Sequence, residues 1–309
     1  MTSAMIVAAL VTATTGATPL LLAATGETVA ERAGVLNLGL EGMMLLGAVC
    51  AFITASATGS SLLGFGAGAL AGMALSGLFA VLTLGLATNQ VASGLAITIF
   101  GTGLSSLLGA RFVGRSVAAL PHLHIPLLSD IPVLGPLLLR QDGLVYTSLA
   151  ITGLVAWALT RTRMGMILRA VGENAGSAHA LGYNVLAISF WAVLFGGALS
   201  GLAGAYLSLA ATPMWMEGLT AGRGWIALAL VVFGAWRPWR VCAGAYLFGG
   251  ISVLQLYLQG SGFVAVPTQV LAMIPYLATL AVLTLLSSGG ARGRLQAPAC
   301  LGKAFTVSH

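Results

Sequence analysis

The side chains most able to do chemistry form a compact charged group near the start of the chain. Glu27 and Glu31 are four positions apart, so a helix would place them on one face, where Arg32 could neutralise one of them. The group is compatible with a hydrated loop that holds an internal ion pair. It is equally compatible with an irregular segment that lines a cavity, because Gly34 and Gly39 would free the backbone. Nothing in the spacing requires acid–base catalysis. The members of the group are Glu27, Glu31, Arg32, Asn37 and Glu41.

A second group of small and polar residues, 172–183, has the signals of a short helix. Asn174 is a favourable N-cap, and Gly182 is favourable just past a helix C-terminus. About two helical turns fit between them. Such a helix could dock into a groove on a partner protein, or it could be a surface helix without a partner. The isolated His179 is expected to be polar surface.

The other reactive side chains predict neither a metal site nor a cofactor. Cys50, Cys242 and Cys300 are too far apart for a disulfide framework or a metal-binding spacing. The single lysine, Lys303, is not part of a phosphate-binding loop, so we expect no ATP hydrolysis by this chain. Asn89 and its neighbour Gln90 are among the isolated polar residues of the apolar runs, where such amides mostly make interhelical hydrogen bonds or, in a few cases, touch a substrate. The sequence has no cluster of basic residues interleaved with aromatic residues, so nucleic-acid binding is not predicted.

The elements that must position these residues are apolar. Of the 309 residues, 58% are hydrophobic and 6% are charged, against roughly 25% charged in an ordinary soluble domain. So little polar surface excludes a water-soluble enzyme. Residues 42–110 carry no charge at all, and a spanning helix needs about 20 residues, so this run can hold three crossings. The sequence therefore predicts an all-α polytopic membrane protein.

We expect about 8 to 10 crossings from the apolar segments. Segment 225–236 is too short for an ordinary span, which predicts a broken or re-entrant helix there. The expected domain is a single transmembrane unit, 1–287, followed by a tail, 288–309. The apolar segments are 5–25, 42–57, 62–84, 90–110, 143–160, 186–210, 225–236, 241–258 and 266–286.

Basic residues predict how the chain is oriented in a plasma or inner membrane. Three groups are expected to face the cytoplasm, which places the C-terminal tail there. Residues 111–142 are then outside, and their four prolines predict short helices at the outer surface rather than a spanning helix. The cytoplasmic groups are a short loop with Arg161, Arg163 and Arg169, a turn with Arg237 and Arg240, and the tail with Arg292, Arg294 and Lys303.

Glycines recur inside the apolar runs at every fourth residue. Gly64, Gly68 and Gly72 form one such row, and Gly197 and Gly201 form another. Small residues with this spacing favour close helix packing in a membrane. The alternative is that some of them permit unwound backbone near a translocation path.

Three stretches carry a resemblance to a known family. Residues 26–44 closely resemble the N-terminal signature of permease subunits of ABC-type nucleoside importers, within the larger group of ribose, simple-sugar and branched-chain amino-acid permeases. Residues 172–183 are similar to the family's cytoplasmic element, although Ser177 and Tyr183 replace its usual Ala and Ile, and 222–229 resemble a third segment. The matches are Gly26, Glu27, Glu31, Arg32, Gly34, Asn37, Gly39, Glu41, Gly42, Met43 and Met44, then Gly172, Asn174, Ala178 and Gly182.

The resemblance, which covers roughly residues 18–287, implies a mechanism and partners. Two permease chains, often a heterodimer, form the pathway in the lipid membrane, and an extracytoplasmic substrate-binding protein delivers the ligand. A cytoplasmic ABC ATPase drives alternating access through short coupling helices. Here 174–182 would be such a coupling helix, with 237–240 as the second choice. The residues that would shape or gate the pathway are Glu27, Glu31, Arg32, Asn37, Glu41 and Asn89.

Other functions remain as alternatives. Within the same architecture, the substrate could be a simple sugar, a riboflavin-like compound or a branched-chain amino acid. An ion-coupled secondary transporter would place charged groups within its helices, whereas here the apolar runs nearly lack them. An intramembrane enzyme would need a catalytic cluster in its spans, and the apolar runs contain no paired Asp, Ser–His or metal-binding set.

Overall fold

A computed structural model describes residues 3–118 and 141–261, single positions between 270 and 284, residues 297–303 and residue 305. The expected outer-surface helices fall mostly within 119–140, and the apolar segment 266–286 is covered at only a few positions. These two predictions, together with that for Arg292 and Arg294, lie outside the described residues.

The described part of the chain is built from helices, and its one β-bridge joins Ser116 and Met214. Six segments are long and apolar enough to cross a membrane: Ala9–Arg32, Leu40–Thr58, Ser61–Gly85, Gln90–Phe112, Gly143–Arg161 and Val185–Ala211. The all-α polytopic fold is therefore confirmed, and the total number of crossings stays a prediction. The α-helices are α1 (Ser3–Arg32), α2 (Leu40–Thr58), α3 (Ser61–Ala80), α4 (Gln90–Gly109), α5 (Gly143–Arg161), α6 (Arg163–Glu173), α7 (Ala175–Ala180), α8 (Val185–Tyr206), α9 (Arg223–Phe233) and α10 (Pro238–Ser261).

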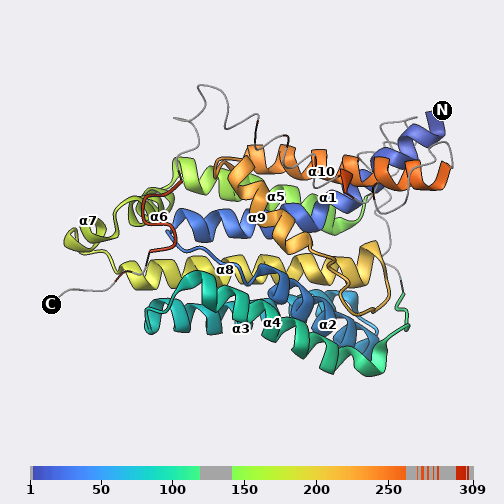
Figure 1. The fold of residues 1–309 in the computed structure, drawn as a ribbon, viewed down its shortest axis with the longest axis horizontal. Helices are drawn as coiled ribbons and strands as arrows, with labels where there is room; N and C mark the ends of the chain where they lie inside the picture. The colour runs from blue at the N-terminus through green and yellow to red at the C-terminus, as the bar shows by residue number, and fades with distance from the viewer. Residues whose placement is uncertain are drawn as a thin grey trace.

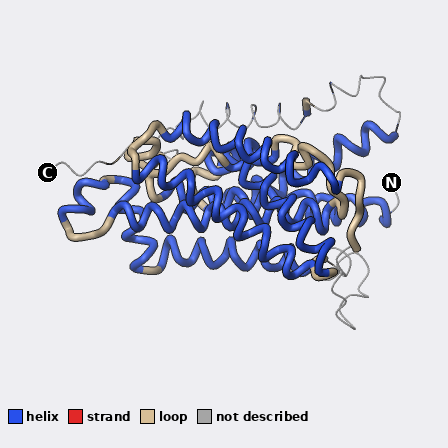
Figure 2. Tube along the Cα trace, turned by 90° about the horizontal axis from the view of Figure 1, so that it is seen from below, coloured by secondary structure: helices blue, strands red, loops and turns tan. Residues whose placement is uncertain are grey.

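The long helices run side by side along the long axis of the molecule, with α8 at the centre (Figures 1 and 2). On one side α8 packs on α2 and α3, and α4 packs on α2. On the other side α8 packs on α1, which is itself contacted by α5, α9 and α10. The acidic residues predicted as functional are therefore carried by α1 and α2, the helices on either side of α8.

Glycines let α2, α3 and α8 approach at backbone distance. A Cβ added at Gly47 would lie 2.5 Å from the Cα of Gly201, and one at Gly72 would meet the carbonyl oxygen of Gly197. Both α3 and α8 are continuous helices through these positions, which confirms close packing rather than unwound backbone. We call this contact the glycine seam; its members are Gly47, Gly68, Gly72, Gly197 and Gly201.

Most predicted apolar segments coincide with helices, but two predictions about this part of the chain differ from the structure. The segment predicted to end at residue 25 continues as α1 to Arg32. The basic stretch after α5 is not a short loop, because Thr162 caps a new helix, α6, by accepting a hydrogen bond from the backbone nitrogen of Gly165 at 3.2 Å. Most of the predicted segment 225–236 falls in α9, which has 11 residues, Arg223–Phe233. That helix is short as expected, and its re-entrant character stays a prediction.

One end of the molecule carries α7, the C-terminal segment and several basic residues, among them Arg32, Arg169 and Arg237. In Figure 1, α6, α7 and the C-terminus lie together at the end opposite the N-terminus. Arg32 is close enough to Arg169, Glu173 and Arg237 for electrostatic interaction. Arg169, Arg237 and the described part of the tail, each from one of the groups predicted to face the cytoplasm, therefore lie at one end of the fold.

Candidate functional site

The acidic residues near the start of the chain are buried in a helix. Gly26 lets α1 lie against α8, since a Cβ there would come within 2.9 Å of the carbonyl oxygen of Gly196. Glu27 and Glu31 follow in the same helix and are 0% and 1% exposed. The hydrated-loop interpretation is therefore wrong. The cavity-lining irregular segment is also wrong for this half of the group, because irregular backbone is confined to residues 33–39.

The turn between α1 and α2 is held by Glu27. Its Oε1 accepts a hydrogen bond from the backbone nitrogen of Asn37 at 3.0 Å, and Asn37 Oδ1 accepts one from the backbone nitrogen of Gly39 at 2.9 Å. Gly34 starts the turn with φ +86°, a conformation that favours glycine. The other carboxylate oxygen, Glu27 Oε2, is buried without a hydrogen-bond partner among the described residues. Glu27 thus holds the α1–α2 turn with one carboxylate oxygen, while its other oxygen is a buried acceptor without a partner among the described residues.

The end of α1 holds the corner between α9 and α10. The indole nitrogen of Trp236 donates a hydrogen bond to Glu31 Oε2, and Arg32 Nε donates to the carbonyl oxygen of Trp236 at 3.1 Å. Arg32 therefore bonds to this carbonyl and not, within the described residues, to either glutamate. Ala235 and Trp236 have φ of +50° and +55°, which costs side-chain-bearing residues roughly 1–2 kcal/mol each. Glu31 and Arg32 stabilise this strained corner.

We expect Trp236→Phe to destabilise the protein, because phenylalanine fills similar space but cannot donate to Glu31. Loss of one hydrogen bond to a buried carboxylate should lower the free energy of unfolding by about 1.5–3 kcal/mol, measured by denaturation of the purified protein in detergent. Trp239→Phe is the matched control, since Trp239 is 63% exposed on the same segment. Equal stability of the two variants would contradict the assigned role.

Glu41, in the first turn of α2, caps the N-terminus of α9. Its Oε1 accepts hydrogen bonds from the hydroxyl of Thr220 at 2.5 Å and the backbone nitrogen of Gly222 at 2.8 Å. Its Oε2 accepts one from the backbone nitrogen of Gly224 at 2.6 Å. Free backbone N–H groups at a helix N-terminus favour a carboxylate both by hydrogen bonding and by the helix dipole. Two of the stretches that resemble the family, 26–44 and 222–229, therefore meet at the side chain of Glu41.

Asn89 does not join the acidic residues. It is exposed and caps α4, accepting a hydrogen bond from the backbone nitrogen of Ala92 at 3.0 Å. Its neighbour Gln90 is 2% exposed, and Gln90 Oε1 accepts from the backbone nitrogen of Leu36 at 2.8 Å. The structure thus brings Gln90, and not Asn89, to the α1–α2 turn.

The short helix predicted near residue 174 is present as α7. Asn174 caps it by accepting a hydrogen bond from the backbone nitrogen of Ser177 at 2.9 Å. At the other end Gly182 has φ +87°. The backbone nitrogen of Gly182 donates to the carbonyl oxygen of His179, and the backbone nitrogen of Tyr183 donates to the carbonyl oxygen of Ala178. This pair of bonds is a Schellman motif, which confirms the predicted caps. Gly172, in the last turn of α6, lies against the end of α1, where an added Cβ would meet the carbonyl oxygen of Arg32.

Taken together, the predicted acids brace helix ends and turns. Glu27 serves the α1–α2 turn, Glu31 the α9–α10 corner and Glu41 the start of α9. Sequence reasoning missed their partners Thr220 and Trp236. The family-like stretch 222–229 pointed to the neighbourhood of Thr220, whereas no local signal marked Trp236.

Comparison with protein families gives a match over most of the chain. The model of the family described as branched-chain amino acid transport system / permease component matches residues 9–283. Among solved structures, none matches this chain.

Three curated relatives are similar over nearly their whole length. A permease protein assigned to a glucose ABC transporter, TsgC13 of Haloferax volcanii, is 40% identical over 94% of this chain and 94% of its own. The nucleoside ABC transporter permease protein NupC of Lactococcus lactis is 34% identical over 87% and 88%. The guanosine ABC transporter permease protein NupQ of Bacillus subtilis is 32% identical over 93% and 92%.

Proposed function

Since this chain belongs to the family of branched-chain amino acid transport system permease components, we propose that it carries nucleosides into the cell. It is a transport subunit of an ABC importer, and its helices supply the membrane-spanning part. The nucleoside assignment rests on the two relatives named for nucleoside and guanosine transport, each similar over at least 87% of this chain. ATP hydrolysis would belong to a separate ABC ATPase subunit.

We assign the contact with this ATPase to α7. Three observations support the assignment: both ends of α7 are capped, most of its residues are exposed, and it lies at the end of the molecule beside α6 (Figure 1). A helix that is capped at both ends can transmit a displacement without its terminal turns unfolding. The positive-inside rule makes this arginine-bearing end cytoplasmic, and the C-terminal segment at the same end would be cytoplasmic too.

The pathway would run beside the turn and corner braced by Glu27, Glu31, Arg32, Asn37 and Glu41. Each of these residues contacts a helix end or a turn that connects two helices. Buried polar groups within a membrane protein commonly mark transport routes. Asn89 stands at the exposed start of α4 and would at most border the route.

The remaining partners of the proposed importer are a second permease chain and an extracytoplasmic substrate-binding protein. A heterodimer of two related permeases is the arrangement that we propose for the pathway. The exposed apolar side chains of α4, such as Ile99 and Leu107, each 74% exposed, would face lipid or that second chain.

Uptake of labelled nucleoside tests the proposal. In cells that express this chain with its partner subunits, uptake should require both this chain and an ATPase subunit with an intact phosphate-binding loop. It should survive a protonophore as long as ATP is maintained. Uptake by this chain alone, abolished by the protonophore, would contradict the ABC mechanism and favour an ion-coupled secondary transporter.

A simple sugar is the second candidate substrate, because TsgC13, at 40% identity, is assigned to glucose transport. Competition decides between the two. Excess unlabelled nucleoside should suppress uptake, and excess glucose or ribose should leave it unchanged. Suppression by glucose at equal concentration, with labelled glucose taken up in turn, would transfer the assignment to sugars.

A further inference from the structure

The end of the chain returns to the junction of α1, α6 and α7. The backbone nitrogen of Cys300 donates to the carbonyl oxygen of Gly172 at 2.9 Å, and that of Gly302 donates to the carbonyl oxygen of Gly34 at 3.3 Å. One short segment therefore binds both the last turn of α6 and the turn that follows α1. We call this segment, residues 298–303 with Phe305, the C-terminal clasp.

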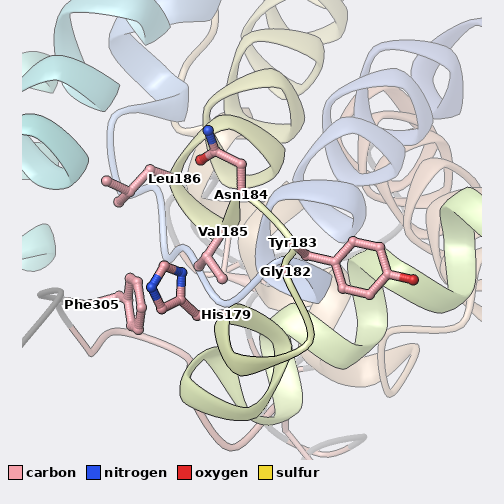
Figure 3. Close-up of a pocket in the computed structure, with 7 residues that line it drawn as sticks. All are labelled: His179, Gly182, Tyr183, Asn184, Val185, Leu186 and Phe305. Atoms are coloured by element: carbon pink, nitrogen blue, oxygen red, sulfur yellow. The ribbon is translucent and has the colours of Figure 1, made fainter.

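Phe305 fastens the clasp to α7. Its ring lies 5.9 Å from that of His179, edge to face at 61°, and it packs on the buried Val171, Ala178 and Val185. Figure 3 shows the two rings next to each other among the residues that line a cavity. The volume of this cavity is about 280 Å³. The clasp therefore contacts α7 through an aromatic side chain, not only through its backbone.

Gln90 connects the clasp to the start of α2 from the other side. Its Nε2 donates to the carbonyl oxygen of Lys303 at 3.4 Å, while its Oε1 accepts from the backbone nitrogen of Leu36. The α1–α2 turn is thus bonded to the clasp at Gly34 directly and at Leu36 through Gln90. The helices that pack most extensively on α7 are α6 and α8, so the clasp adds a separate link from α7 to this turn.

We propose that the C-terminal clasp is a positioning segment of the transport cycle, which carries a displacement of α7 to the α1–α2 turn held by Glu27. This inference rests on the proposed function, since the displacement comes from the ATPase bound at α7. The packed ring of Phe305 ties the clasp to α7, and the hydrogen bond from Gly302 to Gly34 ties it to the α1–α2 turn. Because Glu27 and Gln90 hold the other side of the turn, movement there reaches the buried acids of α1.

The experiment uses the whole transporter, with its ATPase and binding protein, in proteoliposomes. Phe305→Ala removes the ring that joins the clasp to α7 and should lower the nucleoside taken up per ATP hydrolysed by about five-fold or more, a typical coupling effect. The amount of ATPase that co-purifies should stay unchanged, because α7 keeps its own caps. Phe305→Tyr keeps the ring and should restore the ratio.

Lys303→Ala is the matched control within the clasp. The lysine side chain is exposed, and only its backbone carbonyl bonds to Gln90, so this variant should behave as the wild type. Phe305→Leu, a milder change, is measured in parallel and should lower the ratio in the same direction, which covers poor accumulation of the alanine variant.

Two results would overturn the proposal. The first is that Phe305→Ala and Phe305→Leu both take up as much nucleoside per ATP hydrolysed as the wild type does. The other is a loss of uptake that is matched by an equal loss of bound ATPase, since that would mean a structural role alone. Failure of the wild-type transporter to show ATP-dependent uptake would instead overturn the proposed function.

Discussion

Glu41→Ala is expected to abolish transport and to destabilise the chain. The carboxylate accepts three hydrogen bonds at the start of α9, and alanine leaves the hydroxyl of Thr220 and two backbone N–H groups without it. Buried donors that lose a charged acceptor cost several kcal/mol together, so the free energy of unfolding should fall by about 3–5 kcal/mol. Uptake in proteoliposomes and denaturation in detergent measure the two effects.

Glu217→Ala is the control for the loss of a negative charge, because Glu217 is exposed. It should leave both measurements unchanged. Glu41→Gln should be intermediate, because its amide oxygen can still accept hydrogen bonds but its NH2 group would face a backbone N–H. Wild-type stability of Glu41→Ala would show that the start of α9 does not depend on this side chain.

The second large effect is expected for Gly72→Leu in the glycine seam. A Cβ at Gly72 already meets the carbonyl oxygen of Gly197 and the backbone of Gly201, so a larger side chain must push α3 away from α8. Overpacking by this amount costs about 1–3 kcal/mol, so the equilibrium ratio of folded to unfolded protein should fall about ten-fold. Denaturation of the purified protein in detergent measures that ratio.

Gly66→Leu tests whether a leucine in α3 is harmful in itself. Gly66 lies six positions before Gly72 on the same helix, and an added Cβ there would meet nothing within 4 Å. We expect its folded fraction to equal that of the wild type. Equal losses in the two variants would mean that leucine affects α3 wherever it is placed and that the seam has no special role.

The parts of the fold that could be predicted from sequence are those set by local pattern. Apolar runs located the long helices, and the four-residue glycine spacing predicted close helix packing, which the structure shows between α3 and α8. The caps of α7 at Asn174 and Gly182 are likewise local signals, since each residue acts on backbone within a few positions.

The contacts of the candidate site depend on long-range packing, which the sequence pattern does not contain. Glu41 and Thr220 are 179 positions apart, and Glu31 and Trp236 are 205 apart. The helix through Gly26 was misjudged because glycine and charged residues usually favour a loop. Here close packing on Gly196 and buried partners for the acids outweigh that preference.

The glycine seam also limits where this protein can change shape. Backbone touches backbone across Gly47, Gly72 and Gly201, so no side chain at these points can absorb a shift by changing its rotamer. We therefore expect α2, α3 and α8 to move as one rigid body. Under the proposed function, the change between inward-open and outward-open forms would occur around this unit, for example at the hydrogen-bonded joint where α1 meets the Trp236 corner.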